Sequence, residues 1–147
     1  MATVARAQAA PAHLWIVGIL ALLWNGFGCF DYLMTVTNNA AYLAQMSPDQ
    51  LAYMNSLPTW LTGAWAIGVW GGAAGALLLL MRSRHAVLAF ALSMVGAAVT
   101  FLYERLGTTM PPSMNQGAMT IVPWVIIIIA AFLLWYARTE TKKGVLR

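Results

Sequence analysis

The chain has 147 residues, of which 61% are hydrophobic and 8% are charged. A soluble domain carries about 25% charged residues, so these charges are too few to cover a water-facing surface, and the mean hydropathy of +0.73 agrees. This composition excludes a soluble enzyme, a nucleic-acid-binding protein and a disordered tail. The single cysteine, Cys29, excludes a disulfide within the chain and a metal cluster built from several cysteines.

Four apolar stretches of the sequence are each long enough to cross a bilayer. A membrane-spanning helix needs about 20 apolar residues, because it covers about 30 Å at 1.5 Å per residue. Each stretch must be helical, since a lone strand in lipid would leave its backbone polar groups unpaired. The sequence therefore predicts an all-α membrane protein with one domain over residues 1–147. Its predicted four-transmembrane-helix bundle has spans at about 14–36, 59–81, 86–103 and 118–137.

Basic residues are distributed unequally between the two ends of these spans. Only Arg105 lies on the side of the first and third connections. The other seven lie on the opposite side: Arg6, Arg82, Arg84, Arg138, Lys142, Lys143 and Arg147. Short segments rich in Lys and Arg remain in the cytoplasm. We therefore expect both termini to be cytoplasmic, with Arg82, Arg84, Lys142 and Lys143 as the main topology signals.

The longest connection, residues 37–58, joins the first two spans on the outer side. It contains Ser47-Pro48-Asp49-Gln50, a pattern typical of a capping box with proline at the first helical position. Apolar residues follow directly. The pattern predicts a short interfacial helix in the first outer loop, with its apolar side toward the lipid.

Polar side chains form a stripe on the outer half of the first span. Because they recur at steps of three and four residues, they share one helix face. A tryptophan of the second span lies at a similar depth, and a glutamate ends the third span on the same side. Polar groups in hydrocarbon are costly and are often functional. The candidate ligand-binding residues are Asn25, Asp31, Tyr32, Thr35, Trp65 and Glu104.

Two interpretations of this polar stripe remain open. It lines a cavity for a small polar solute, or its members form hydrogen bonds between helices, which we favour. Asp31 and Arg105 are placed to form an ion pair across the bundle, and this pairing would leave Glu104 for water or for a ligand. The two carboxylates lack the third oxygen-rich group that a cation site would need.

The sequence gives little support for catalysis or for a cofactor. The two histidines lie near helix ends, and neither has a second histidine in its span to share a haem. Cys29 and Ser93 lie in apolar runs with no histidine at their depth to act as a base. We therefore expect no enzymatic activity, no cofactor and no metal.

Small residues gather on the second span in two overlapping Gly-x-x-x-Gly pairs. Such spacing lets helix backbones approach closely in lipid. The face is predicted to contact the third span or to form a dimer interface. The candidate packing residues are Gly68, Gly71, Gly72 and Gly75, together with Ser93 and Gly96 of the third span.

Several short motifs follow one another along nearly the whole chain. They are Leu23-Trp24-Asn25-Gly26-x-Gly28, Leu57-Pro58-x-Trp60, Phe90-x-x-Ser93-x-x-Gly96, Leu134-Trp135-Tyr136-Ala137 and Lys142-Lys143-Gly144. With these motifs the chain resembles a family of small four-helix bacterial inner-membrane proteins that are often labelled sugar transporters. The resemblance implies a multi-pass protein of the bacterial inner (cytoplasmic) membrane, and it supplies no catalytic residues.

Two functions are compatible with these features. In the first, which the residues favour, the chain is a non-catalytic accessory or interaction protein. Its glycine-rich face then packs on a second copy or on a larger membrane complex. In the second, it binds or transports a small polar solute, as the family label suggests. Transporters usually build their path from repeats and broken helices, and the first two spans do not resemble the last two. The expected partners are the lipid bilayer, a homo-oligomer or membrane complex, and in the second case the solute, but no nucleic acid.

Overall fold

The computed structural model describes residues 8–147, which form helices and connections without any strand. Its long helices are α1 (Ala12–Val36), α4 (Thr59–Leu80), α5 (Ala86–Leu102) and α6 (Ala118–Lys142). Each is long and apolar enough to span a membrane when the π-helical turn η1 (Tyr103–Gly107) is counted with α5. The predicted bundle of four transmembrane helices is confirmed.

Helix ends differ from the predicted spans by a few residues. The largest difference is at α6, which continues five residues beyond the predicted position 137. The sequence there is polar, which suggested that the helix had ended. Glu140 is nevertheless only 1% exposed, because the final turn of α6 packs against its own chain rather than lying in water.

The short helix predicted in the first outer loop is also present, as α3 (Pro48–Ser56), and a single turn, α2 (Ala40–Leu43), precedes it. The Ser47 hydroxyl accepts from the Gln50 backbone N–H at 3.4 Å, and the Ser47 N–H donates to the Gln50 side-chain oxygen at 3.1 Å. This reciprocal capping box satisfies two N–H groups that the first helical turn leaves free. A 3₁₀ turn, η2 (Pro112–Met114), lies in the second outer connection.

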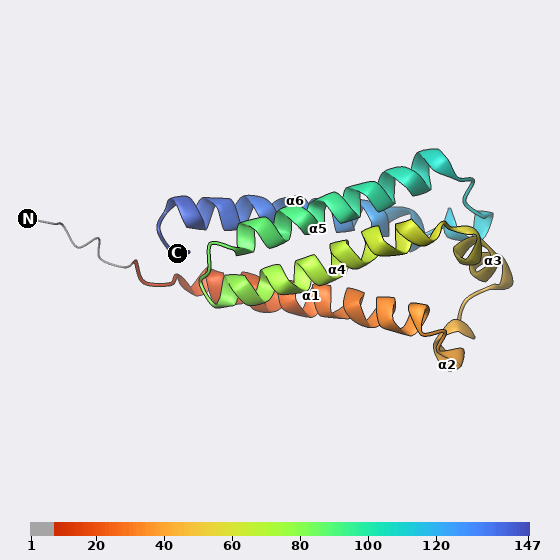
Figure 1. Cartoon of the computed structure of the whole chain (residues 1–147), viewed down its shortest axis with the longest axis horizontal. Coiled ribbons are helices and arrows are strands. Elements are labelled where there is room, and N and C mark those ends of the chain that lie inside the picture. Colours follow the sequence, from red (N-terminus) through yellow and green to blue (C-terminus); the bar gives the residue numbers. More distant parts are fainter. Residues whose placement is uncertain (1–7) are drawn as a thin grey trace, which may run out of the picture.

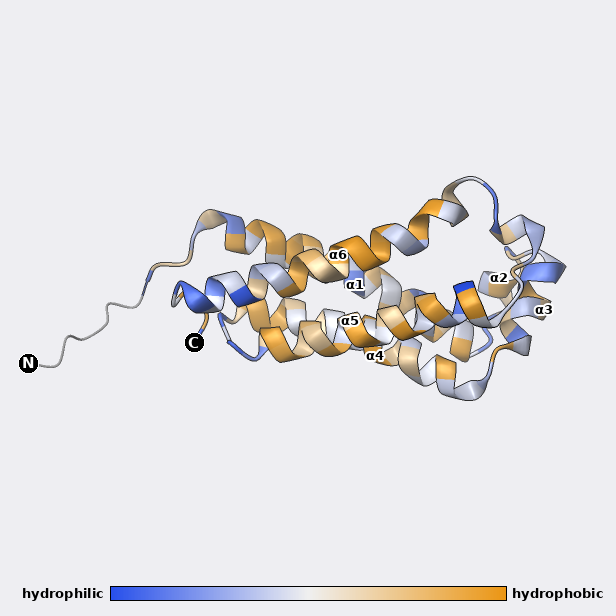
Figure 2. Cartoon of the chain, turned by 90° about the horizontal axis from the view of Figure 1, so that it is seen from above, coloured by the Kyte–Doolittle hydropathy of each residue, from blue (hydrophilic) through white to orange (hydrophobic). Residues whose placement is uncertain are grey.

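Both ends of the described chain lie at the same end of the bundle, which we call the termini end (Figure 1). The opposite end carries α2, α3 and η2, and we call it the loop end. Hydrophobic residues fill the middle of the helices, whereas hydrophilic residues gather at the two ends (Figure 2). This distribution is the one that a bilayer requires of a membrane-spanning bundle.

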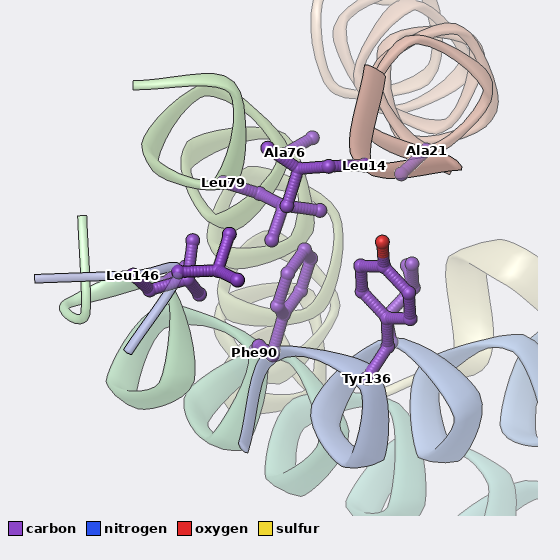
Figure 3. Packing of buried hydrophobic residues seen from close by; sticks show 11 residues of the cluster. Leu14, Ala21, Ala76, Leu79, Phe90, Tyr136 and Leu146 are labelled. Atoms are coloured by element: carbon purple, nitrogen blue, oxygen red, sulfur yellow. The ribbon is translucent and has the colours of Figure 1, made fainter. Parts of the chain in front are cut away.

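Packing follows the order α1, α4, α5, α6, in which each helix packs on the next. The buried apolar core lies at the termini end. Phe90 of α5 and Tyr136 of α6 point into the space between the helices there (Figure 3). The cluster consists of Leu14, Ala21, Ala76, Leu79, Ala86, Phe90, Leu133, Tyr136, Ala137, Val145 and Leu146.

The glycine-rich face of α4 lies against helices of the same chain. A Cβ added at Gly71 would lie 3.2 Å from the Ser93 backbone nitrogen of α5, and one added at Gly96 would lie 2.6 Å from the Gly68 nitrogen. The Ser93 hydroxyl also donates to the Gly68 carbonyl at 2.6 Å. Of the two contacts predicted for this face, with the third span or with a second copy, the structure shows the one with the third span, α5.

Two other glycines of α4 make room for side chains rather than for backbone. A Cβ added at Gly75 would lie 2.6 Å from the Phe90 ring, and one added at Gly72 would overlap the side-chain amide of Asn25. The stripe therefore serves two neighbours, with Gly72 turned toward α1 and the other three glycines toward α5.

Candidate functional site

Asn25 lies in the seam between α1 and α4. Its side-chain nitrogen donates to the Ala21 carbonyl, one turn earlier in the same helix, at 2.8 Å. Its amide occupies the space that a Gly72 side chain would otherwise fill. A buried amide must be hydrogen-bonded to avoid a cost of about 1–3 kcal/mol. The structure thus gives Asn25 a partner and a packing position within the chain.

Aromatic side chains continue this seam toward the loop end. The Tyr32 ring of α1 packs edge-to-face on the Trp65 ring of α4, with 5.0 Å between the ring centroids. The centroid of the Trp70 ring, also on α4, lies 6.4 Å from that of Tyr32. The structure therefore brings together two of the predicted ligand-binding residues, Tyr32 and Trp65. Their contact is a direct aromatic pair, an arrangement that stabilises helix packing.

The Asp31 carboxylate is paired with Tyr42 of α2. The Tyr42 hydroxyl donates to it at 2.5 Å. This hydrogen bond, together with burial, raises the pKa of Tyr42 to about 12. The bond fixes α2 on the end of α1.

The ion pair expected between Asp31 and Arg105 does not form. The Arg105 guanidinium lies 5.5 Å from the centre of the Phe101 ring, one turn earlier in the chain. The prediction was wrong because it rested on the similar depth of the two residues along the bundle. It did not take into account on which sides of the bundle their helices lie. The helix order places α4 between α1 and α5.

Glu104 belongs to a different neighbourhood from the polar stripe of α1. It is half-buried in the π-helical turn η1, and its backbone carbonyl accepts from the Thr108 hydroxyl at 3.3 Å. Thr108 in turn lies 2.8 Å from the hydroxyl of Tyr53 in α3. Single π-helical turns often occur at functional sites. The six candidate residues therefore divide into a group on the α1–α4 seam and Glu104 beneath α3.

Thr35 is the member of the α1 group whose polar atom is unsatisfied. Its hydroxyl oxygen is buried and has no hydrogen-bond partner within residues 8–147. Burying a hydroxyl without a partner costs free energy. The described helices therefore leave this one polar atom of the α1 group unsatisfied, at a position that solvent does not reach.

A hydrogen-bonded cap holds the two outer connections together. The Asp49 carboxylate accepts from the Ser47 hydroxyl at 2.5 Å and from the Ser113 hydroxyl of η2. These bonds, with that of Ser113 the largest contribution, lower the pKa of Asp49. Burial raises the pKa of Tyr53 on the neighbouring surface of α3. Sequence reasoning identified the helix but missed this cap, because nothing in the sequence pairs positions 49 and 113.

A second polar group, also missed, lies at the termini end. His13 Nδ1 lies 2.5 Å from the Tyr136 hydroxyl and joins α1 to α6. One turn further along α6, a Glu140 oxygen pairs with the Lys143 ammonium at 3.0 Å. The other Glu140 oxygen is buried without a partner in the described part of the chain. The i, i+3 spacing of Glu140 and Lys143 was a signal for their pairing.

These features define a class of protein. Four long apolar helices with hydrophilic ends make the chain a multi-pass membrane protein. Comparison of the chain with known protein families, with curated proteins and with solved structures gives no match.

Proposed function

We propose that the protein is a non-catalytic accessory protein of the bacterial inner membrane that acts by side-by-side association with other membrane helices. It then works as a homo-oligomer or as a subunit of a larger complex. The observation that carries the proposal is the exposure of α6. Only 6% of its most apolar 18-residue window is buried, compared with 22–28% in the other three spans.

The polar groups of the spans support the same proposal. Asn25 and Ser93 donate to backbone carbonyls, and Tyr32 and Trp65 pack on each other. The Ser93 bond joins α5 to α4 and the aromatic pair joins α1 to α4, whereas the Asn25 bond lies within α1. Since the glycine face is covered by α5 and α1, the least buried span, α6, offers the association surface.

Photo-crosslinking tests this proposal. A photo-crosslinking amino acid is placed at Ile128 of α6 and, as a matched control, at Phe27 of α1. These residues are 65% and 68% exposed. We expect a discrete protein adduct from position 128 in native membranes and only lipid adducts from position 27. Adducts at the mass of two chains indicate a homo-oligomer, and larger ones indicate a complex. Lipid adducts alone at both positions would contradict the proposal.

The alternative is binding or transport of a small polar solute. It is supported by the Thr35 hydroxyl, which has no hydrogen-bond partner in the described part of the chain, and by the resemblance to proteins labelled sugar transporters. Specific solute flux into liposomes containing only this protein would favour it over association, particularly if position 128 gave no protein adduct.

Orientation in the membrane is a related proposal. The charge distribution places the termini end in the cytoplasm. A reporter that is active only in the periplasm should therefore be inactive when fused after Arg147 and active when inserted beside Ser47. The reverse pattern of activities would show that the bundle is inserted the other way round.

A further inference from the structure

Residues 145–147 fold back against the turn between α4 and α5. The Arg147 N–H donates to the Arg82 carbonyl at 2.9 Å, and the Arg84 N–H donates to the Arg147 backbone oxygen at 2.9 Å. Val145 and Leu146 are 2% and 3% exposed and belong to the apolar core. This short backbone pairing fixes Arg147 beside a turn that is more than 60 residues away in the sequence.

Arg82 stabilises this arrangement from the other side. Its backbone has φ +58°, a left-handed conformation that is uncommon for a residue with a side chain. Its guanidinium donates to the Val145 carbonyl at 3.2 Å and to the Gln8 carbonyl. The side chain therefore joins the turn, the tail and the segment before α1. Its Nε and Nη2 donors are engaged in these two bonds, so only its remaining N–H groups are free for a ligand, and they are held in a fixed position.

The tail and the turn enclose an open hollow of about 380 Å³, lined by Met81, Arg82, Ser83 and Arg147. Two of these described lining residues have cationic side chains, and none is an aspartate or a glutamate. The nearest acidic side chain in sequence, Glu140, is buried in the bundle and paired with Lys143. The lining thus comes from two arginines, a serine and Met81, which is 73% exposed.

We propose that this hollow binds the phosphate group of an anionic phospholipid. A guanidinium offers a planar pair of N–H donors that matches phosphate oxygens. Basic pockets at the ends of membrane helices bind acidic headgroups in this way. The position selects a lipid over a soluble phosphate, because the hollow begins at Met81, directly after the last residue of α4. An acyl chain leaving the hollow would lie along the apolar surface of that helix.

Lipid titration of the purified protein in neutral detergent tests the site. The probes are phosphatidylglycerol, phosphatidylcholine and inorganic phosphate, with binding measured by native mass spectrometry and by the shift in melting temperature. We expect phosphatidylglycerol to bind and stabilise the wild type more than phosphatidylcholine does. Arg147→Gln should weaken that binding about tenfold, since a charge-assisted hydrogen bond contributes about that factor. Arg147→Lys should give an intermediate loss, because it keeps the charge without the planar donors.

Arg138→Gln provides the matched control, because Arg138 is an exposed basic residue at the same end of the bundle. It should bind phosphatidylglycerol as the wild type does. Equal weakening in Arg138→Gln and Arg147→Gln would overturn the proposal, since it would indicate diffuse attraction to the basic surface. Equal binding of the two lipids would also overturn it. Inorganic phosphate that binds as tightly as phosphatidylglycerol would replace the lipid with a soluble phosphate ligand. Without lipid, Arg147→Gln should melt as the wild type does, because the tail pairs through its backbone.

Discussion

Gly96→Ala should strongly destabilise the bundle, although it adds a single methyl group. The added carbon would lie 2.5 Å from the Ala64 carbonyl oxygen and 2.6 Å from the Gly68 nitrogen. Both are backbone atoms of α4, so no side chain can rotate away and the two helices must separate. Overpacking of this kind costs about 1–3 kcal/mol, and separation also weakens the hydrogen bond from Ser93 to Gly68. The effect is measured by thermal unfolding in detergent, with the loss of the monodisperse gel-filtration peak as the readout.

Gly26→Ala is the matched control for this experiment. No atom of residues 8–147 lies within 4 Å of a Cβ added there, and alanine favours a helix over glycine by about 1 kcal/mol. This variant should be as stable as the wild type or slightly more so. If both variants had the melting temperature of the wild type, the α4–α5 contact would not be as close as the structure shows.

Phe90→Ala and Gly75→Ala should each lower the free energy of unfolding. The double variant should lose less of this free energy than the sum of the two single losses. Phe90 is 1% exposed, and its ring occupies the space that the absent Gly75 side chain leaves. Removing a buried phenylalanine side chain costs about 3–5 kcal/mol in well-packed cores. Adding a methyl group at Gly75 pushes against the ring at 2.6 Å. In the double variant the new methyl group has room and fills part of the cavity.

A double-mutant cycle on melting free energies measures this coupling, because residues in contact are not additive. Leu88→Ala serves as the control on the same helix, since Leu88 is 62% exposed. Leu88→Ala should lower the free energy of unfolding much less than Phe90→Ala does. Its effect should add to that of Gly75→Ala without coupling. Strict additivity of Phe90→Ala and Gly75→Ala would show that the ring and the glycine do not share this space.

The candidate site was predictable only in part. Depth along each helix follows from counting 1.5 Å per residue, and it correctly brought Tyr32 near Trp65. Position around the bundle does not follow from counting. Asp31 and Glu104 share one end of the bundle, yet α4 lies between their helices, so they do not form one site.

The sequence by itself determined that the protein is a four-helix membrane bundle with a capped helix in its first loop. Apolar stretches of this length have no alternative in lipid, and the capping box is a purely local interaction. Only the tertiary structure decided which glycine faces which helix and that α5 covers the glycine face. It also decided that Asp31 pairs with Tyr42 and that residues 145–147 lie beside Arg82. These contacts depend on the order and rotation of helices that are almost uniformly apolar, and a pattern without a polar face does not encode which side turns inward.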